Sequence, residues 1–185
     1  MSKRSTNLSW LARGSVGVAL LASVLAGVGG SAHGNAGAAA LPASAAPPAL
    51  TPPAGNVLSS VYRARGVQVY QCTAGAWTFV EPAATLVGYA GRLRTAVHFR
   101  GPSWESTEDG SLVEARAVAS SPVAGSIPEL LLQATRNRGD GDFGRVTYVQ
   151  RLATSGGAAP AGACTEGATT GVVYQAGYRF FVPAS

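Results

Sequence analysis

Residues 98–112 bring together several side chains that could bind a ligand or transfer a proton. The stretch carries a histidine, a tryptophan and three acidic residues, and it includes the turn dipeptide Asp109-Gly110. Arginine offers paired hydrogen bonds to a carboxylate, and tryptophan offers an apolar platform. This combination favours recognition of a carboxylated or sugar-like ligand. The candidate ligand-binding residues are His98, Arg100, Trp104, Glu105 and Asp109.

A hydrolase is the alternative function for the same stretch. Glu105 and Asp109, or Glu108, would serve as acid and base, because neighbouring carboxylates can have their pKa values pushed apart, as glycoside cleavage requires. His98 would then be a titrating partner. In a purely structural interpretation, His98 and Arg100 pair with the acidic side chains of the same hairpin, at about 0–1 kcal/mol for each exposed pair. We therefore assign no catalytic residue.

Neither a metal nor a cofactor is expected. Zinc sites usually gather several histidine or cysteine ligands, and His98 is the one histidine that lies far from the N-terminus. Residues 139–144 spell G-x-G-x-x-G, but a dinucleotide site needs a strand before this motif and a helix after it. Here the expected order is reversed, so we interpret the motif as a turn. A serine nucleophile motif of the G-x-S-x-G kind is absent after the N-terminal segment.

The candidate residues must be positioned by strands. Residues 93–100 alternate with period two, which places Arg94, Ala96, His98 and Arg100 on one face. His98 is therefore expected on a polar face between two guanidinium groups. Residues 112–118 are typical of the returning strand, so the stretch 98–112 would be the exposed tip of a long hairpin.

The rest of the chain after the N-terminal region is also rich in strand patterns. Residues 67–80 predict a hairpin, residues 145–152 a strand, and residues 172–182 a strand with an aromatic face. One short helix is expected near 127–136, because Ser126 and Glu129 have the spacing of a capping box. The predicted fold class is mainly β, an antiparallel β sandwich or barrel with this one helix. An α+β arrangement is the alternative.

The N-terminal region predicts export. A basic start, an apolar run over residues 16–28 and small residues after it are typical of a signal peptide, which we place at residues 1–36. An uncleaved anchor is the alternative, although the run is shorter than the roughly 20 residues of a spanning helix. Residues 37–54 predict a flexible Ala/Pro-rich linker, and residues 55–185 a single β-rich domain. The expected location is secreted, periplasmic or in the cell envelope, with no stable membrane insertion once the signal is cleaved.

The net charge bears on the class of partner, and the two cysteines bear on a disulfide. The chain has a net charge of +5, but three basic residues and no acidic ones lie in the signal, which leaves +2 for the remainder. Nucleic-acid binding is not expected at so low a charge, so the expected partner is an unidentified small molecule, glycan or envelope ligand. Cys72 and Cys164 would form a disulfide in an oxidising compartment, and two buried free thiols are the alternative.

Several short motifs lie in a characteristic order along residues 55–182. They are 66–72 (GVQVYQC), 98–105 (HFRGPSWE), 109–111 (DGS), 127–132 (IPELLL), 146–151 (VTYVQR) and 154–160 (TSGGAAP), with Cys164 after them. This ordered set resembles the secreted bacterial and fungal family known as domain of unknown function 3455. The resemblance implies an exported, compact domain with a two-cysteine frame, and it implies no established activity.

Overall fold

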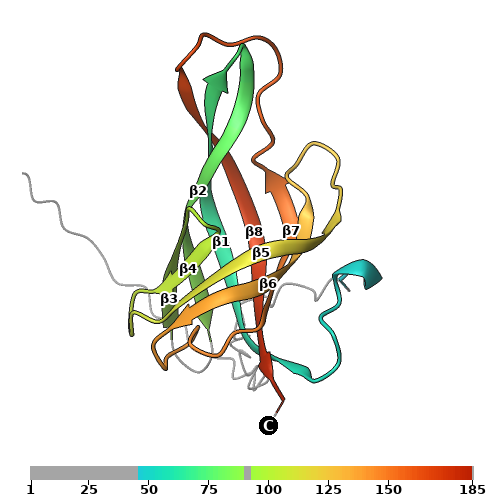
Figure 1. The fold of residues 1–185 in the computed structure, drawn as a ribbon, viewed down its shortest axis with the longest axis vertical. Coiled ribbons are helices and arrows are strands. Elements are labelled where there is room, and N and C mark those ends of the chain that lie inside the picture. The colour runs from blue at the N-terminus through green and yellow to red at the C-terminus, as the bar shows by residue number, and fades with distance from the viewer. Residues whose placement is uncertain (1–45, 90–92, 185) are drawn as a thin grey trace, which may run out of the picture. The chain divides into compact units, whose positions relative to one another are not determined.

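Eight antiparallel strands form a closed barrel in the computed structural model, which describes residues 46–89 and 93–184 (Figure 1). Neighbouring strands pair in sequence order, and β1 also pairs with β8, which closes the barrel. The expectation of a mainly β, antiparallel fold is confirmed, and no α-helix lies in the described residues. The elements are η1 Pro48–Leu50, β1 Asn56–Thr73, β2 Ala76–Tyr89, β3 Leu93–Phe99, β4 Ser103–Ser106, β5 Leu112–Ser121, β6 Glu129–Arg138, β7 Tyr148–Gly156 and β8 Thr169–Pro183.

Three long strands project from the barrel as an arm (Figure 1). β1 has 18 residues and β8 has 15, whereas β4 has only 4. We use the name arm for residues 69–81 of the β1–β2 hairpin together with residues 169–173 of β8. Strand pairing continues along the arm, with Cys72 opposite Trp77 and Gln71 opposite Thr169. The hairpin predicted over residues 67–80 is therefore present.

A disulfide joins the arm to the loop between β7 and β8. Cys72 and Cys164 are bonded, with their Cα atoms 5.8 Å apart, so the predicted pairing is confirmed and the free-thiol alternative is wrong. Hydrogen bonds support the same junction: the Cys72 amide donates to the Ala168 carbonyl oxygen at 2.8 Å, and the Ala74 amide donates to Glu166 Oε2 at 2.8 Å. The loop is thereby fixed to one side of the arm.

The helix predicted near 127–136 is wrong, because this segment forms strand β6. The Ser126 hydroxyl, expected to cap a helix, instead donates to the Gly156 carbonyl oxygen at 3.0 Å. The Ile127 amide donates to the same oxygen at 2.9 Å. These bonds direct the chain across to the end of β7 instead of into a helical turn.

The leucines of β6 explain why its sequence has helical spacing. Leu132 faces the barrel interior, where it joins the main core. Leu131 faces outward, yet it is only 5% exposed because it packs against Leu50 and Leu152. Apolar side chains are therefore buried on both faces of this strand. A run of consecutive leucines meets this need, and the same run also fits the apolar spacing of a helix.

The end of the predicted linker is packed on the barrel. The predicted signal peptide and the linker up to residue 45 lie outside the described residues. Leu50 is fully buried over β6 and β7, and Gln150 Nε2 donates to its carbonyl oxygen at 2.6 Å. Residues 48–50 are therefore part of the folded body and not a free linker. No helix in the described part of the chain has the length and apolar character to cross a membrane.

The barrel end opposite the arm is filled by the loop between β6 and β7. Phe143 of this loop is fully buried, and its ring centroid lies 4.6 Å from that of Phe180 and 5.7 Å from that of Tyr62. The Asn137 side-chain amide donates to the Phe143 carbonyl oxygen at 2.8 Å, which holds the loop in place. This end of the interior is therefore a solid aromatic core.

We predict that breaking the disulfide destabilises the protein without changing the fold. The bond closes a segment of 92 residues, and the chain-entropy model gives a stabilisation of roughly 4–5 kcal/mol for a loop of that length. Cys164→Ser, whose side chain is not deeply buried, should lower the free energy of unfolding by about 2–5 kcal/mol in urea titrations. Unchanged unfolding midpoints for the wild type with and without a reductant would contradict this role.

Candidate functional site

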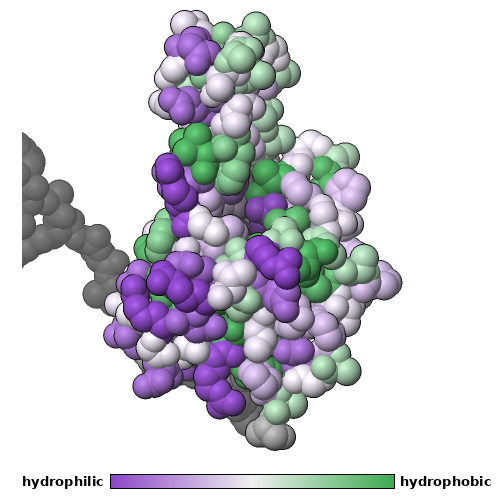
Figure 2. Space-filling model, in the orientation of Figure 1, coloured by the Kyte–Doolittle hydropathy of each residue, from purple (hydrophilic) through white to green (hydrophobic). Residues whose placement is uncertain are grey.

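A cavity of about 470 Å³ opens inside the barrel beneath the arm. On the face drawn in Figure 2, apolar side chains gather around the base of the arm. Every strand of the barrel contributes to the cavity, and its walls are mainly apolar. The lining residues are Gln68, Tyr70, Phe79, Val80, Pro82, His98, Gly101, Pro102, Trp104, Ala117, Ile127, Pro128, Leu130, Leu132, Arg151 and Tyr178.

Three aromatic side chains form the floor of the cavity. The His98 and Trp104 rings are stacked, with centroids 4.4 Å apart and planes at 4°. They meet because these residues are directly opposite each other on β3 and β4. The ring of Tyr178, from β8, stands edge-on to both at 5.3 and 5.4 Å. All three residues are at most 3% exposed.

The sequence predicted His98 on a polar face of β3, but in the structure His98 is buried and does not face solvent. The alternation along β3 is present, but the face that carries Ala96 and His98 points into the barrel. His98 Nδ1 is 2.8 Å from the Ser103 carbonyl oxygen. Burial lowers the pKa of His98 to about 3, and the bond to Ser103 opposes this shift only in part. The ring is therefore neutral, with Nδ1–H as donor and Nε2 as acceptor.

Three of the predicted site residues lie away from the cavity. Arg100 is exposed and forms an ion pair with Glu81, with Nε 3.2 Å from the carboxylate oxygen. Glu105 follows Trp104 on β4 and pairs with Arg138 at 2.8 Å. Neither Arg100, Glu105 nor Asp109 lines the cavity. Of the five predicted residues, the structure brings only His98 and Trp104 together there.

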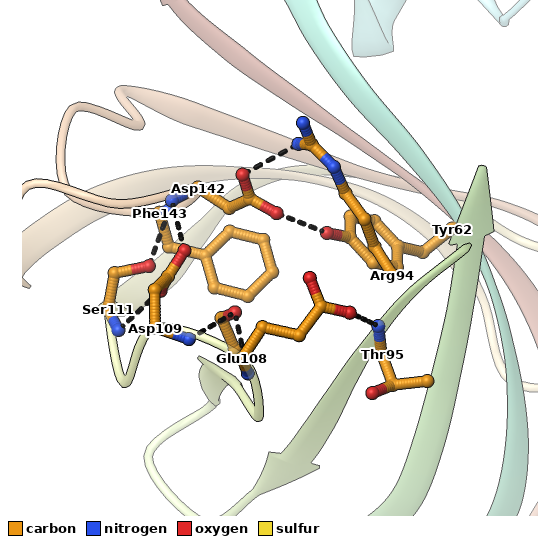
Figure 3. Close-up of polar contacts among 9 residues, drawn as sticks. Tyr62, Arg94, Thr95, Glu108, Asp109, Ser111, Asp142 and Phe143 are labelled. Carbon is orange, nitrogen blue, oxygen red and sulfur yellow. Dashed lines mark hydrogen bonds and ion pairs between the residues drawn. The ribbon is translucent and has the colours of Figure 1, made fainter. Parts of the chain in front are cut away.

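Asp109 helps to hold the filled end of the barrel (Figure 3). Its carboxylate accepts hydrogen bonds from the Ser111 amide at 2.8 Å and from the Asp142 amide at 3.1 Å. Burial acts to raise the pKa of Asp109, but bonds from Ser111, Asp142 and Ser106 outweigh it and lower the pKa to about 2. A side chain at Gly141 would place its Cβ 2.2 Å from Asp109 Cγ, so this close approach requires glycine.

Asp142 lies in the same network. Arg94 Nη1 donates to one of its carboxylate oxygens at 2.6 Å, and the Tyr62 hydroxyl donates to the other at 3.0 Å (Figure 3). Arg94 is therefore turned toward the filled end of the barrel and is not available to a ligand beside His98. These contacts tie β1 and β3 to the loop that carries Phe143.

Polar groups at the cavity floor were missed by the sequence analysis. Gln68 Nε2, Trp104 Nε1 and the Tyr178 hydroxyl are buried, and none has a hydrogen-bond partner in the described residues. Arg151 and Tyr174 lie close to the Tyr178 hydroxyl but outside hydrogen-bonding geometry. The sequence placed Tyr178 on the aromatic face of residues 172–182, and the structure shows that this face points into the barrel. Strand alternation alone did not show that side chains from β1, β4 and β8 would meet.

The loop between β5 and β6 contributes Ile127 and Pro128 to the cavity wall, and the β7–β8 loop packs against residues of the lining. The Tyr70 hydroxyl donates to the Gly157 carbonyl oxygen at 2.7 Å, and the Thr154 hydroxyl donates to the Ile127 carbonyl oxygen at 2.7 Å. Gly157 has φ +78°, and a Cβ at this position would lie 2.8 Å from Tyr174 Cβ. Glycine is therefore needed where the β7–β8 loop passes over the barrel.

No group of three or more histidine, cysteine or acidic side chains in residues 46–89 and 93–184 is arranged to hold a metal ion. The cavity lining offers one imidazole and no carboxylate among these residues. The lining provides apolar contact, hydrogen-bond donors and one acceptor that we assign, His98 Nε2.

We predict that His98 makes stability depend on pH. Between about pH 6.5 and about pH 3 the unfolded chain takes up a proton that folded His98 does not, so stability should fall as pH decreases through this window, by at most about 1.4 kcal/mol per pH unit. His98→Phe retains a stacking ring without a titrating group. Urea titrations at several pH values should show that the free energy of unfolding changes less with pH for this variant than for the wild type. The same change with pH in both proteins would contradict a buried neutral histidine.

We predict that Asp109 adds a second pH dependence of stability, in a more acidic range than that of His98. Its stabilising effect should be present above the unfolded pKa near 3.8 and be lost as pH falls through about 2. Asp109→Asn should therefore melt at a lower temperature than the wild type at pH 7, with the difference shrinking between pH 4 and pH 2. Asp140→Asn, an exposed substitution in the adjoining loop, is the matched control. Equal melting temperatures for Asp109→Asn and Asp140→Asn would contradict this role.

Comparison with known proteins gives one match. Residues 53–182 match a family described as a protein of unknown function, DUF3455. No curated protein matches the chain. No solved structure matches it either. The matched span includes all eight strands apart from the last residue of β8, both cysteines and the whole cavity lining. The resemblance noted from the motifs is thus confirmed, and this chain belongs to the DUF3455 family of proteins of unknown function.

Proposed function

We propose that this protein is an exported binding module that holds a small, largely apolar molecule in the cavity beneath the arm. The observation that carries the proposal is a cavity of about 470 Å³ whose lining contains three buried polar groups that have no hydrogen-bond partner among the described residues. Small-molecule sites are typically clefts of roughly 300–1,000 Å³ with mostly apolar walls and a few polar groups. An eight-stranded barrel is also wide enough to enclose one small ligand.

The unpaired polar groups favour a ligand over an empty cavity. A buried donor without an acceptor costs about 1–3 kcal/mol of stability. Gln68, Trp104 and Tyr178 each carry such a group at 2% exposure or less. A bound molecule that accepts these hydrogen bonds would recover that cost, and its apolar part would gain contact with the stacked rings of the floor.

Two features support an extracellular or envelope location. The Cys72–Cys164 disulfide is a bond that persists in oxidising compartments. The start of the sequence has the pattern of a secretory signal. The ligand would therefore be a molecule encountered outside the cytoplasm. Within residues 98–112, we assign its contacts to His98 and Trp104.

A hydrolase that uses Glu105 and Asp109 has less support. Glu105 is held by Arg138, and Asp109 accepts hydrogen bonds from two backbone amides. Neither carboxylate lines the cavity. The structural contacts of both side chains are a sufficient account of their presence in this stretch.

Filling the cavity mouth should abolish binding. Ala117 lines the cavity but is exposed, so Ala117→Trp would occupy the opening with little disturbance of the core. We expect a saturable fluorescence increase when the neutral probe N-phenyl-1-naphthylamine binds the wild-type protein, and loss of this increase in Ala117→Trp.

The neighbouring position provides the matched control. Val118 is 42% exposed and does not line the cavity. Val118→Trp should therefore bind the probe as the wild type does. Equal binding by Ala117→Trp and the wild type, or no saturable binding by the wild type, would refute the proposed site.

A further inference from the structure

The structure points to the chemical class of the ligand: we infer that it is an apolar molecule with a single carboxylate group, and that Arg151 binds this carboxylate inside the cavity. This inference rests on the proposed function, because it assigns the ligand of the same site. Three observations support it: the position of Arg151, the absence of an acidic partner for Arg151 among the described residues, and the hydrogen-bond donors in the rest of the lining.

Arg151 lies in the barrel interior. It is on β7 two residues after Val149, which belongs to the main core, and it lines the cavity. Its positive charge acts on the ionisation of four inward-facing side chains, and in each case it lowers the pKa. These side chains are Tyr70, His98, Tyr174 and Tyr178. The guanidinium group is therefore close enough to these four side chains to act on them electrostatically, and Tyr70, His98 and Tyr178 line the same cavity.

Arg151 has no acidic partner in the part of the chain that the structure describes. The ion pairs there are Arg94–Asp142, Arg100–Glu81, Arg136–Glu114 and Arg138–Glu105. Arg151 instead donates from Nε and Nη2 to the Pro128 carbonyl oxygen, at 3.1 and 2.9 Å. These bonds orient the guanidinium group and leave donors on Nη1. A partly buried cation of this kind is normally paired with an anion.

The other polar groups of the lining are suited to the same head group. Gln68 Nε2 and Trp104 Nε1 can only donate hydrogen bonds, and neither has an acceptor in residues 46–89 and 93–184. Burial raises the pKa of Tyr178, so its hydroxyl also remains a donor. No carboxylate side chain lines the cavity among the described residues. The donors outnumber the acceptor that we assign, His98 Nε2, and the site therefore matches an anionic hydrogen-bond acceptor better than a cation.

The walls define the rest of the ligand. Most of the side chains above the floor are aliphatic or aromatic, including Phe79, Ile127, Leu130 and Leu132. A polyhydroxylated sugar would bury its hydroxyl groups against these walls without partners. A free inorganic anion would leave the walls uncovered. A compact hydrocarbon body with one carboxylate satisfies both parts of the cavity.

Three naphthalene derivatives with different head groups test the inference on the purified wild-type protein. They are 1-naphthylacetate, 1-naphthylacetamide and 1-naphthylmethylamine, which share a ring system and carry an anionic, a neutral and a cationic group. Isothermal titration calorimetry should rank the acid first by about tenfold or more over the amide, because hydrogen bonds to charged groups are the stronger ones. The amine should bind most weakly.

Variants of Arg151 test the assigned residue. Arg151→Met should reduce the affinity for 1-naphthylacetate about tenfold or more, close to that of the amide, and leave the affinity for the amide largely unchanged. Arg151→Lys should retain part of the preference for the acid. Arg116→Met is the matched control, because Arg116 is exposed, bonds to Gln133 and does not line the cavity. Circular dichroism would establish that each variant is folded.

The outcomes separate the two proposals. If none of the three compounds binds, the proposed function itself fails. If the amide or the amine binds as tightly as the acid, or if folded Arg151→Met keeps the preference for the acid, the carboxylate inference fails while the binding site stands. Should Arg151→Met not fold, the ranking of the three compounds on the wild-type protein and on Arg151→Lys still decides the question.

Discussion

The stack of His98 on Trp104 divides the interior of this barrel into two parts with different contents. An eight-stranded barrel is just wide enough for side chains to fill it or for one small molecule to enter. On the side of Phe143, large rings from the strands and from the β6–β7 loop occupy the space. On the side of the arm, the inward side chains leave part of the space unfilled, and a cavity remains. The stack is thus both the top of the core and the floor of the site.

The two parts also differ in how their polar groups are satisfied. At the filled end, the carboxylate of Asp142 accepts bonds from Arg94 and Tyr62, so the charge of Arg94 is paired with an acid of the fold, although Arg94 Nε has no partner among the described residues. At the cavity end, within the part of the chain that the structure describes, Gln68 and Tyr178 have polar groups without a hydrogen-bond partner, and the hydrogen bonds of Arg151 go to a carbonyl oxygen alone. Buried donors that folding leaves unpaired are costly, and such groups in the lining of a cavity are an expected feature of a ligand site.

Local patterns in the sequence predicted the antiparallel fold, the disulfide and the residues that share a face of β3. They could not show which face of β3 points inward, because both faces mix polar and apolar residues and the burial of His98 depends on closure of the barrel. The helix prediction failed for a related reason: the outward side chain of Leu131 is covered by Leu50, a contact between distant segments. Arg151 had no local signal, since its role depends on side chains from several strands that meet only in the barrel.

A crystal structure of the protein with 1-naphthylacetate tests the central claim most directly. The account predicts the naphthalene ring in the cavity beneath the arm, in contact with Trp104, and a carboxylate oxygen within hydrogen-bonding distance of Arg151. A cavity closed by rearranged side chains, or a ligand bound outside the barrel with Arg151 still held only by the Pro128 carbonyl oxygen, would contradict the account.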